Sequence, residues 1–289
     1  MALAPLLAGF GIKAGLMPFH GWLADAHSAA PGPVSAMFSG LMVNLGVIAI
    51  ARVALDGYAV HRTALPTRLM VFGATSAILG AALALGQDEL KRLLAYDTIS
   101  QMAILLTATG AGTLKAVTGL TYHLIDHALF KTLLFLCAGA IVHATGMTRL
   151  SQMGGLARHR PVVTAAFLLG MASIAGLPPL NGYASLGLIH DALRVDHPAA
   201  FAAVLVAQVL TVAGRRTLRS SGVGTTSTTR WSGCVPACWS PSVSWPAAAS
   251  RSAYCRALSS STSQLRQPPY FSITVRTPRR HWQARPRCG

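Results

Sequence analysis

Three ionisable side chains stand at a spacing of four inside one apolar stretch of this sequence. His123, His127 and Lys131 lie within residues 114–146, where most other side chains are apolar. On an α-helix, steps of four residues drift by only about 40° each, so the three side chains share one face. Because a charge at the centre of a bilayer costs about 2.5–3.5 kcal/mol, such a row predicts an interior path for protons or ions. The alternative for the two histidines is a structural role, in which they hydrogen-bond to neighbouring helices.

Asp126 lies beside this row but points elsewhere, about 60° around the helix from His123 and about 100° from His127. It can therefore join the path or pair with a neighbouring helix. No nucleotide-binding glycine loop, cofactor-binding cysteine set or nucleophile constellation stands out along the chain. We expect no catalytic residues, no cofactor and no metal site in the chain itself.

The composition predicts a membrane protein built from helices. Of 289 residues, 52% are hydrophobic and 11% are charged, whereas soluble domains have about 25% charged residues. Apolar runs long enough to cross a bilayer predict an all-α, polytopic transmembrane bundle of about seven spans. The expected spans cover residues 2–19, 32–55, 69–86, 94–110, 114–144, 162–180 and 198–214. The first run lacks a basic start and contains Lys13, so it is interpreted as a true helix and not as a signal peptide.

The composition changes abruptly after Gly214, which predicts two segments. Residues 215–289 contain twelve arginines, no lysine and no acidic residue, together with four of the five cysteines. The net charge is therefore +4 over residues 1–214 (12 basic and 8 acidic) and +12 over residues 215–289. We expect residues 1–214 to form the transmembrane domain and residues 215–289 to form an Arg/Ser/Pro/Thr-rich tail that is disordered.

Three interpretations of this basic tail remain open. Its arginines and interleaved tryptophans are of a kind that binds anionic lipid or nucleic acid. Its cysteines, Cys234, Cys238, Cys255 and Cys288, could ligate a metal, although their spacing fits no tight zinc pattern. The favoured interpretation is a stretch translated out of frame from a GC-rich gene, and we therefore expect no nucleic-acid partner.

A second feature near the amino end suggests a helix broken within the membrane. Lys13 is flanked by glycines at a distance of two residues and is followed by Pro18. This combination allows a helix to break at depth, provided that neighbours or water satisfy the freed backbone groups. The ordinary alternative for Lys13 is a side chain that reaches toward a helix end and the membrane surface.

Several motifs in register resemble a known family of membrane subunits. They are PFHGWLADAH at 18–27, APGPVS at 30–35, QDELKRLLAYDTIS at 87–100, HLIDHALFK at 123–131, GGL at 154–156 and GLPPLNG at 176–182. In this order they resemble the antiporter-like subunits shared by NADH:quinone oxidoreductase, multisubunit sodium/proton antiporters and membrane-bound hydrogenases. Within that family they are most similar to the large membrane subunit of hydrogenase-4 and formate hydrogenlyase complexes.

The resemblance implies a proton-translocating subunit that is not itself catalytic within an oxidoreductase complex. It implies broken helices, partner subunits and the lipid bilayer as surroundings. The implied location is multi-pass in the cell inner (plasma) membrane. Loops one, three and five, which are the connections at residues 20–31, 87–93 and 145–161, would lie in the cytoplasm. Lys13 would be the midplane lysine of a broken helix, and His123, His127 and Lys131 would relay protons toward the far half-channel. Burial disfavours charged lysine and histidine titrates near neutral pH, so both residue types suit proton exchange. The alternatives are a cation/proton antiporter subunit and a truncated, non-conducting membrane fragment.

The chain also departs from the family pattern. Asn44 stands where many relatives have a lysine, and an asparagine can pass on a hydrogen bond but cannot hold a proton. Leu186 stands where an acidic residue is expected, which leaves Asp191 as a displaced substitute, and Asp97 replaces a small hydroxyl residue. The helix that carries the family's acidic partner for Lys13 is absent from this sequence, so the inverted-repeat module is expected to be incomplete at both ends.

The segment after Pro18 adds three polar candidates, His20, Asp25 and His27. We expect these residues in a loop, where solvation at the membrane surface is the ordinary explanation and a role in the proton path is the alternative. Counting lysines and arginines does not decide the orientation. Loops one, three and five together carry five of these residues, and loops two, four and six together also carry five.

Overall fold

The computed structural model describes residues 3–56, 64–153 and 155–218, and within these ranges the regular elements are helices. A single isolated bridge joins Glu89 and Arg149. The all-α prediction is therefore confirmed for the described part of the chain. Residues 219–289, which include the four tail cysteines and most of the predicted basic tail, lie outside the described residues.

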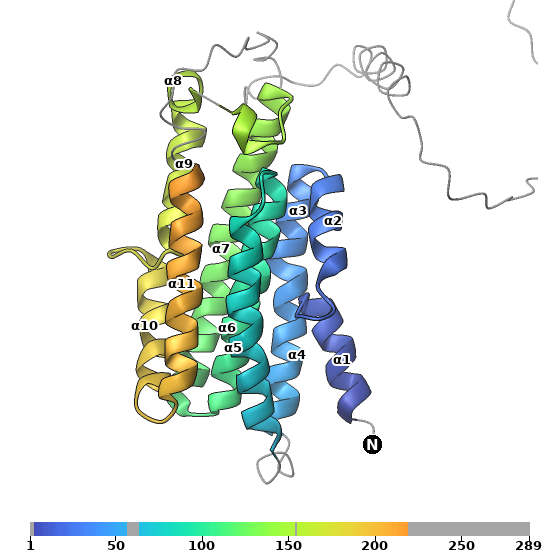
Figure 1. Ribbon diagram of the computed structural model, residues 1–289, viewed down its shortest axis with the longest axis vertical. Coiled ribbons are helices and arrows are strands. Elements are labelled where there is room, and N and C mark those ends of the chain that lie inside the picture. Colours follow the sequence, from blue (N-terminus) through green and yellow to red (C-terminus); the bar gives the residue numbers. More distant parts are fainter. Residues whose placement is uncertain (1–2, 57–63, 154, 219–289) are drawn as a thin grey trace, which may run out of the picture. The chain divides into compact units, whose positions relative to one another are not determined.

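The helices run along a common direction and pack side by side (Figure 1). In chain order they are α1 (Leu3–Ala14), α2 (Gly21–Ala29), α3 (Gly32–Met37), the π-helical turn η1 (Phe38–Met42), α4 (Val43–Asp56), α5 (Leu65–Leu85), α6 (Leu90–Ala111), α7 (Leu114–Thr145), the 3-10 turn η3 (Leu150–Gln152), α8 (Leu156–His159), α9 (Pro161–Ile174), α10 (Asn181–Arg194) and α11 (Pro198–Leu218). Helix α11 continues past Gly214, so the helical part extends beyond the boundary expected from composition.

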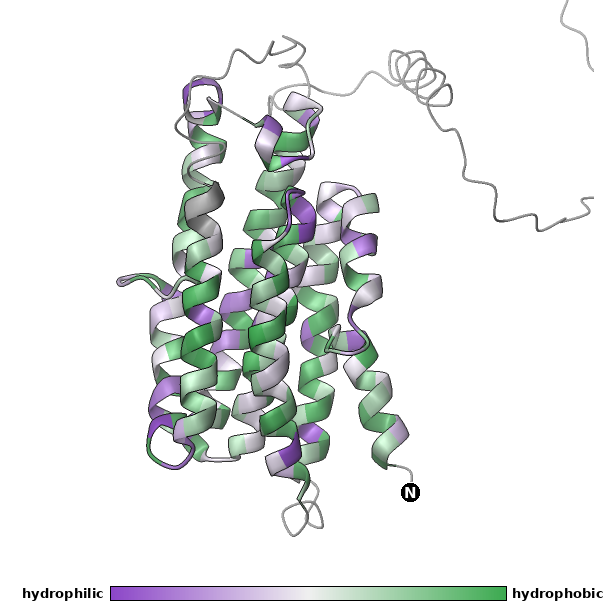
Figure 2. Ribbon diagram, in the orientation of Figure 1, coloured by the Kyte–Doolittle hydropathy of each residue, from purple (hydrophilic) through white to green (hydrophobic). Residues whose placement is uncertain are grey.

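Each expected span contains a helix, but the helices differ in length and hydropathy. In the described part of the chain, three segments are long and apolar enough to cross a membrane, namely Gly32–Leu55, Leu65–Leu85 and Leu114–Thr145. Leu3–Ala14, Pro161–Ile174 and Pro198–Gly214 are shorter apolar helices. Helical surfaces are mostly hydrophobic, while hydrophilic residues gather at loops and helix ends, with a few inside the bundle (Figure 2). The count of seven spans remains a prediction.

Two of the expected spans are broken helices. The first was expected to run from residue 2 to 19, but α1 ends at Ala14 and α2 begins at Gly21. The sixth was expected to run from residue 162 to 180, but α9 ends at Ile174 and α10 begins at Asn181. A glycine with positive φ follows each first half, Gly15 at 67° and Gly176 at 67°, a backbone conformation that other residues rarely adopt. Both breaks lie part-way along the bundle and not at its ends (Figure 1).

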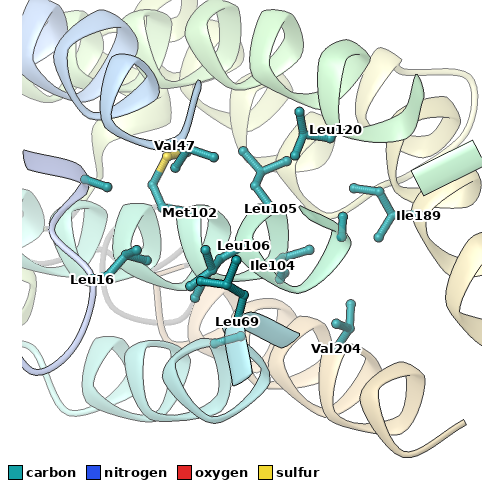
Figure 3. Packing of buried hydrophobic residues seen from close by; sticks show 14 of the residues in the cluster. Leu16, Val47, Leu69, Met102, Ile104, Leu105, Leu106, Leu120, Ile189 and Val204 are labelled. Atoms are coloured by element: carbon teal, nitrogen blue, oxygen red, sulfur yellow. The ribbon is translucent and has the colours of Figure 1, made fainter. Parts of the chain in front are cut away.

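Helix α6 forms the centre of the bundle. Nearly all its residues from Leu90 to Gly110 are buried, and it contacts α2, α4, α5, α7, α10 and α11. Side chains of Leu16, Val47, Leu69, Met102 and other apolar residues fill the space around it (Figure 3). Small residues allow α5 to approach closely, because a Cβ at Gly73 would lie 2.6 Å from the Thr107 nitrogen. Polar residues of α6 are therefore held at fixed positions inside the protein.

The connections that follow α2, α5 and α7 are bonded to one another at one end of the bundle. Lys91 donates a 2.8 Å hydrogen bond to the Ala30 carbonyl, and Arg92 pairs with Asp25. Asp88 accepts hydrogen bonds from the Ser151 hydroxyl and backbone N–H at 2.7 and 2.9 Å. These two donors stabilise the charged carboxylate and lower the pKa of Asp88. Loops one, three and five therefore lie on the same side.

Candidate functional site

Helix α7 carries the row of ionisable residues. The helix is capped at its start by the Thr113 hydroxyl, which accepts from the Ala116 N–H at 3.2 Å, and it ends at a left-handed glycine, Gly146. His123, His127 and Lys131 are all fully buried, with 0% exposure. The spacing therefore places the three residues as the sequence predicted, facing protein and not the outer surface of the bundle.

His123 is held by two neighbouring helices. Its Nε2 lies 3.0 Å from Oε1 of Gln101 on α6, and its Nδ1 lies 3.0 Å from the hydroxyl of Ser185 on α10. With the Gln101 oxygen as acceptor, Nε2 is the donor of this hydrogen bond. The hydroxyl of Ser185 can either donate or accept. His123 can therefore keep both hydrogen bonds whether its ring is neutral or charged.

His127 has a different environment. Within the described residues, neither of its ring nitrogens has a hydrogen-bond partner. Its ring meets the edge of Phe130 at a centroid distance of 5.4 Å and lies 6.5 Å from the ring of His123. A buried polar atom without a partner is uncommon in native proteins and needs an explanation. Two unpaired nitrogens between His123 and Lys131 are suited to a transient proton carrier.

Lys131 ends the row with a buried ion pair. Its Nζ lies 2.7 Å from Oδ2 of Asp97 and donates to the Leu94 carbonyl at 3.0 Å. The two side chains are 0% and 7% exposed. Sequence reasoning noted Asp97 only as a departure from the family pattern and did not place it in the site. An aspartate in an apolar helix is itself a signal for function, and it could have marked this residue.

Asp126 and Asn44 lie beside the row and contact other helices. Asp126 accepts a 2.9 Å hydrogen bond from the Asn181 amide at the start of α10. It thus holds the break between α9 and α10, which is the neighbour-pairing alternative considered above. Asn44 follows the π-helical turn and donates to the Gly40 and Leu124 carbonyls at 2.9 and 3.1 Å, while its side-chain oxygen has no partner in the described part.

Lys13 is not brought together with the other predicted residues. It lies in the last turn of α1, just before the break, and its side chain is exposed. In the described ranges it forms no ion pair with a carboxylate. The prediction that Lys13 marks a broken helix is supported by the backbone, while its role as a proton carrier stays a prediction.

The expectation of a solvated loop after Pro18 was wrong for His27. This residue lies in α2, is 0% exposed, and stacks on Phe135 at a centroid distance of 4.5 Å. Neither of its ring nitrogens has a hydrogen-bond partner within the described residues. Asp25 is exposed and pairs with Arg92, as expected for the surface. In the described part, no three residues among His, Cys, Asp and Glu gather in a way that could hold a metal ion.

Comparisons with known proteins agree with this arrangement. The sequence model described as "NADH:quinone oxidoreductase/Mrp antiporter, TM" matches residues 1–211. Hydrogenase-4 component B of Escherichia coli is 43% identical over 61% of this chain and 28% of its own length. Formate hydrogenlyase subunit 3 of Escherichia coli is 36% identical over 71% of this chain and 35% of its own length. The chain thus spans about a third of the length of these curated relatives.

A comparison with solved structures shows that the fold is also similar to that of a known membrane complex. A chain in the Mrp complex from Dietzia sp. DQ12-45-1b is 30% identical and superimposes with a TM-score of 0.73. The match covers 78% of this chain and 43% of that chain. The broken helices and the buried row therefore occur in a fold that is also found in a multi-subunit membrane complex.

Proposed function

Since this chain belongs to the NADH:quinone oxidoreductase/Mrp antiporter transmembrane family, we propose that it relays protons through the membrane as a non-catalytic subunit of a redox-driven complex. The observation that carries the proposal is the fully enclosed row His123, His127 and Lys131 on α7, ended by a buried ion pair. Its similarity to relatives named as hydrogenase-4 and formate hydrogenlyase components favours a hydrogenase-linked complex.

The three residues of the row differ in how each can hold or pass on a proton. His123 keeps its two hydrogen bonds in both protonation states, His127 offers two unpaired nitrogens, and Lys131 carries a charge beside a carboxylate. Proton relays in membrane proteins are built from such ionisable groups facing the interior of a bundle. A row that served only to join helices would be expected to have its buried nitrogens paired. Among the residues that the structure describes, neither ring nitrogen of His127 has a hydrogen-bond partner.

Partners and location follow from the same proposal. The redox chemistry belongs to partner subunits, and changes in their state drive proton movement along the row. The proposed location is the cell inner membrane. Loops one, three and five are bonded together at one end of the bundle, and the family resemblance assigns this end to the cytoplasmic side.

The experiment is proton transport by the complex purified through a tag on this chain and reconstituted into liposomes. Acidification is followed with a pH-sensitive dye while the redox reaction is driven, in wild type and in Lys131→Ala. The control is Lys115→Ala, which alters an exposed lysine near the start of the same helix. We expect loss of transport in Lys131→Ala alone. Equal transport by the two variants would contradict the proposal, and proton movement driven by a sodium gradient without the redox reaction would indicate a cation/proton antiporter.

A further inference from the structure

The carboxylate of Asp97 lies between Lys131 and a pocket in the protein. One oxygen, Oδ2, is bonded to the Lys131 ammonium at 2.7 Å, while the other, Oδ1, is buried and has no partner among the described residues. Asp97 also lines a small pocket of about 10 Å³, close to the space that one water molecule needs, between α5, α6, α9 and α11, together with Leu93, Met171 and Thr211. The same side chain therefore touches the end of the histidine and lysine row and the wall of this pocket.

We propose that Asp97 is a proton carrier of this chain, which takes a proton from Lys131 and releases it toward the pocket between α5, α6, α9 and α11. This inference rests on the proposed function and extends it by naming the step after Lys131. It also changes the expected course of the path, because the sequence pointed to the region of Leu186 and Asp191 for a terminal acid. Asp191 is exposed on α10, whereas Asp97 is buried against Lys131.

The transfer balances without any further reactant. An N–H bond of the Lys131 ammonium breaks and an O–H bond forms on Oδ2 of Asp97, which leaves a neutral amine and a neutral carboxylic acid. The acid then gives this proton to water in the pocket, and the carboxylate is restored. Lys131 becomes charged again when it receives a proton from the side of His127. No oxidant or reductant takes part, and the pair returns to its starting state after each proton.

The low-dielectric surroundings make the neutral state of the pair accessible. Two charges removed from water lose solvation that their mutual attraction restores only in part, so burial reduces the advantage of the ion pair over its neutral form. Both side chains are nearly inaccessible to solvent, and the ammonium also donates to an uncharged carbonyl, that of Leu94. A change in the local field then shifts the position of the proton between the two side chains.

Other titratable groups face Lys131, but Asp97 is the better acceptor. His127 on α7 and His27 on α2 both lie close enough to interact with its charge. His127 precedes Lys131 in the row and serves as donor. The ring of His27 is stacked on Phe135 and meets the edge of Phe38. The direct hydrogen bond from Nζ to Oδ2 gives Asp97 the shortest route for the proton.

Transport by reconstituted complexes tests the role of Asp97 with three variants. Asp97→Asn keeps the size of the side chain but cannot take up a proton, so transport is expected to fall by about 100-fold. Asp97→Glu restores a carboxylate and is expected to recover most of the transport with a shifted pH profile. Asp196→Asn removes an exposed carboxylate between α10 and α11 and is expected to transport like wild type.

A spectroscopic measurement keeps the proposal testable even if Asp97→Asn does not fold. Infrared difference spectra of the full chain in liposomes, recorded across a pH titration with ¹³C-labelled aspartate, are expected to show the C=O band of a buried carboxylic acid. Asp97→Glu is expected to remove the labelled band. Wild-type transport by Asp97→Asn, or spectra without such a band, would overturn the inference. The proposed function fails separately, through unchanged transport in Lys131→Ala.

Discussion

Lys131 and Lys13 are both lysines in apolar helices, and the family resemblance predicted the same kind of role for both. Lys131 is fully buried on α7 and forms an ion pair with Asp97 across the contact between α6 and α7. Lys13 is exposed at the end of α1, and within the described residues no carboxylate pairs with it. The surroundings of each lysine, and not its residue type, determine whether the chain itself can use it as a proton carrier.

The difference has a physical basis in the packing of the two regions. Around Lys131, helix α6 is buried along its whole length and supplies both the carboxylate and a carbonyl to the ammonium. Around Lys13, α1 packs against α4 and leaves one face exposed. A buried charge must be paired, whereas an exposed one is solvated at little cost. Within the described residues, the α6–α7 region therefore holds a buried ion pair, whereas α1 leaves Lys13 exposed.

The largest expected effect on stability comes from removing Lys131. In Lys131→Met the carboxylate of Asp97 loses its partner in the interior, and a broken buried pair costs about 3–5 kcal/mol. We expect a clearly lower free energy of unfolding, measured in detergent by denaturant titration. The matched change Lys13→Met is expected to stay within about 0.5 kcal/mol of wild type, as for most exposed positions.

A double variant tests whether this loss comes from the unpaired charge. Lys131→Met combined with Asp97→Asn removes both charges and is expected to recover much of the stability lost in Lys131→Met. If the double variant were less stable than either single variant, the ion pair would not explain the difference between the two lysines.

The two histidines of the row provide the next comparison. His123→Ala leaves Gln101 and Ser185 without their buried partner, and an unsatisfied buried group costs about 1–3 kcal/mol. His127→Ala breaks no hydrogen bond with a described residue. We expect the larger loss of thermal stability in His123→Ala, and a loss of proton transport in both variants. Unchanged transport in His127→Ala would limit the role of the row to structure.

The tight packing behind the row gives a further, smaller effect. Gly139 of α7 faces Gly32 of α3, and a Cβ at Gly139 would lie 2.7 Å from the Cα of Gly32. We expect Gly139→Ala to force the helices apart at a cost of about 1–3 kcal/mol. A Cβ at Gly187 of α10 would meet no atom within 4 Å, so Gly187→Ala serves as the control and is expected to unfold at or above the wild-type temperature.

The smallest expected effect concerns the loops at the end of the bundle. The pKa of Asp88 is lowered by the two hydrogen bonds from Ser151, so this carboxylate stabilises the folded state above its unfolded pKa. The contribution is lost as the pH falls through the lowered pKa. We expect Asp88→Asn to unfold at a slightly lower temperature than wild type near neutral pH. This difference should shrink as the pH drops below about 4. A difference independent of pH would contradict the linkage.

The sequence was sufficient to predict the row and its helix. Steps of four residues in an apolar stretch place His123, His127 and Lys131 on one face whatever the rest of the fold is. The pairing of Lys131 with Asp97 could not be predicted in this way. The two residues lie on different helices and 34 positions apart, so their contact depends on the relative register of α6 and α7. Such a register is set by packing, for which a single sequence gives no periodic signal.

The broken helices were predicted in part. Lys13, its flanking glycines and Pro18 indicated a break in the first span, and the structure has one after Ala14. The break after Ile174 and the helix α10 beyond it were not predicted, because residues 181–194 contain His190, Asp191 and Arg194 and lack a long apolar run. For the same reason the sequence predicts a loop where α2 lies. Short polar helices beside a break are stabilised by tertiary contacts more than by local pattern.

The central proposal is that the enclosed row on α7, His123, His127 and Lys131, carries protons through this chain. The most direct test is the number of protons moved per electron by the reconstituted complex with Lys131→Ala, compared with Lys13→Ala. The account predicts a lower ratio for Lys131→Ala while the uncoupled redox rate stays at the wild-type level. A wild-type ratio in Lys131→Ala would contradict it.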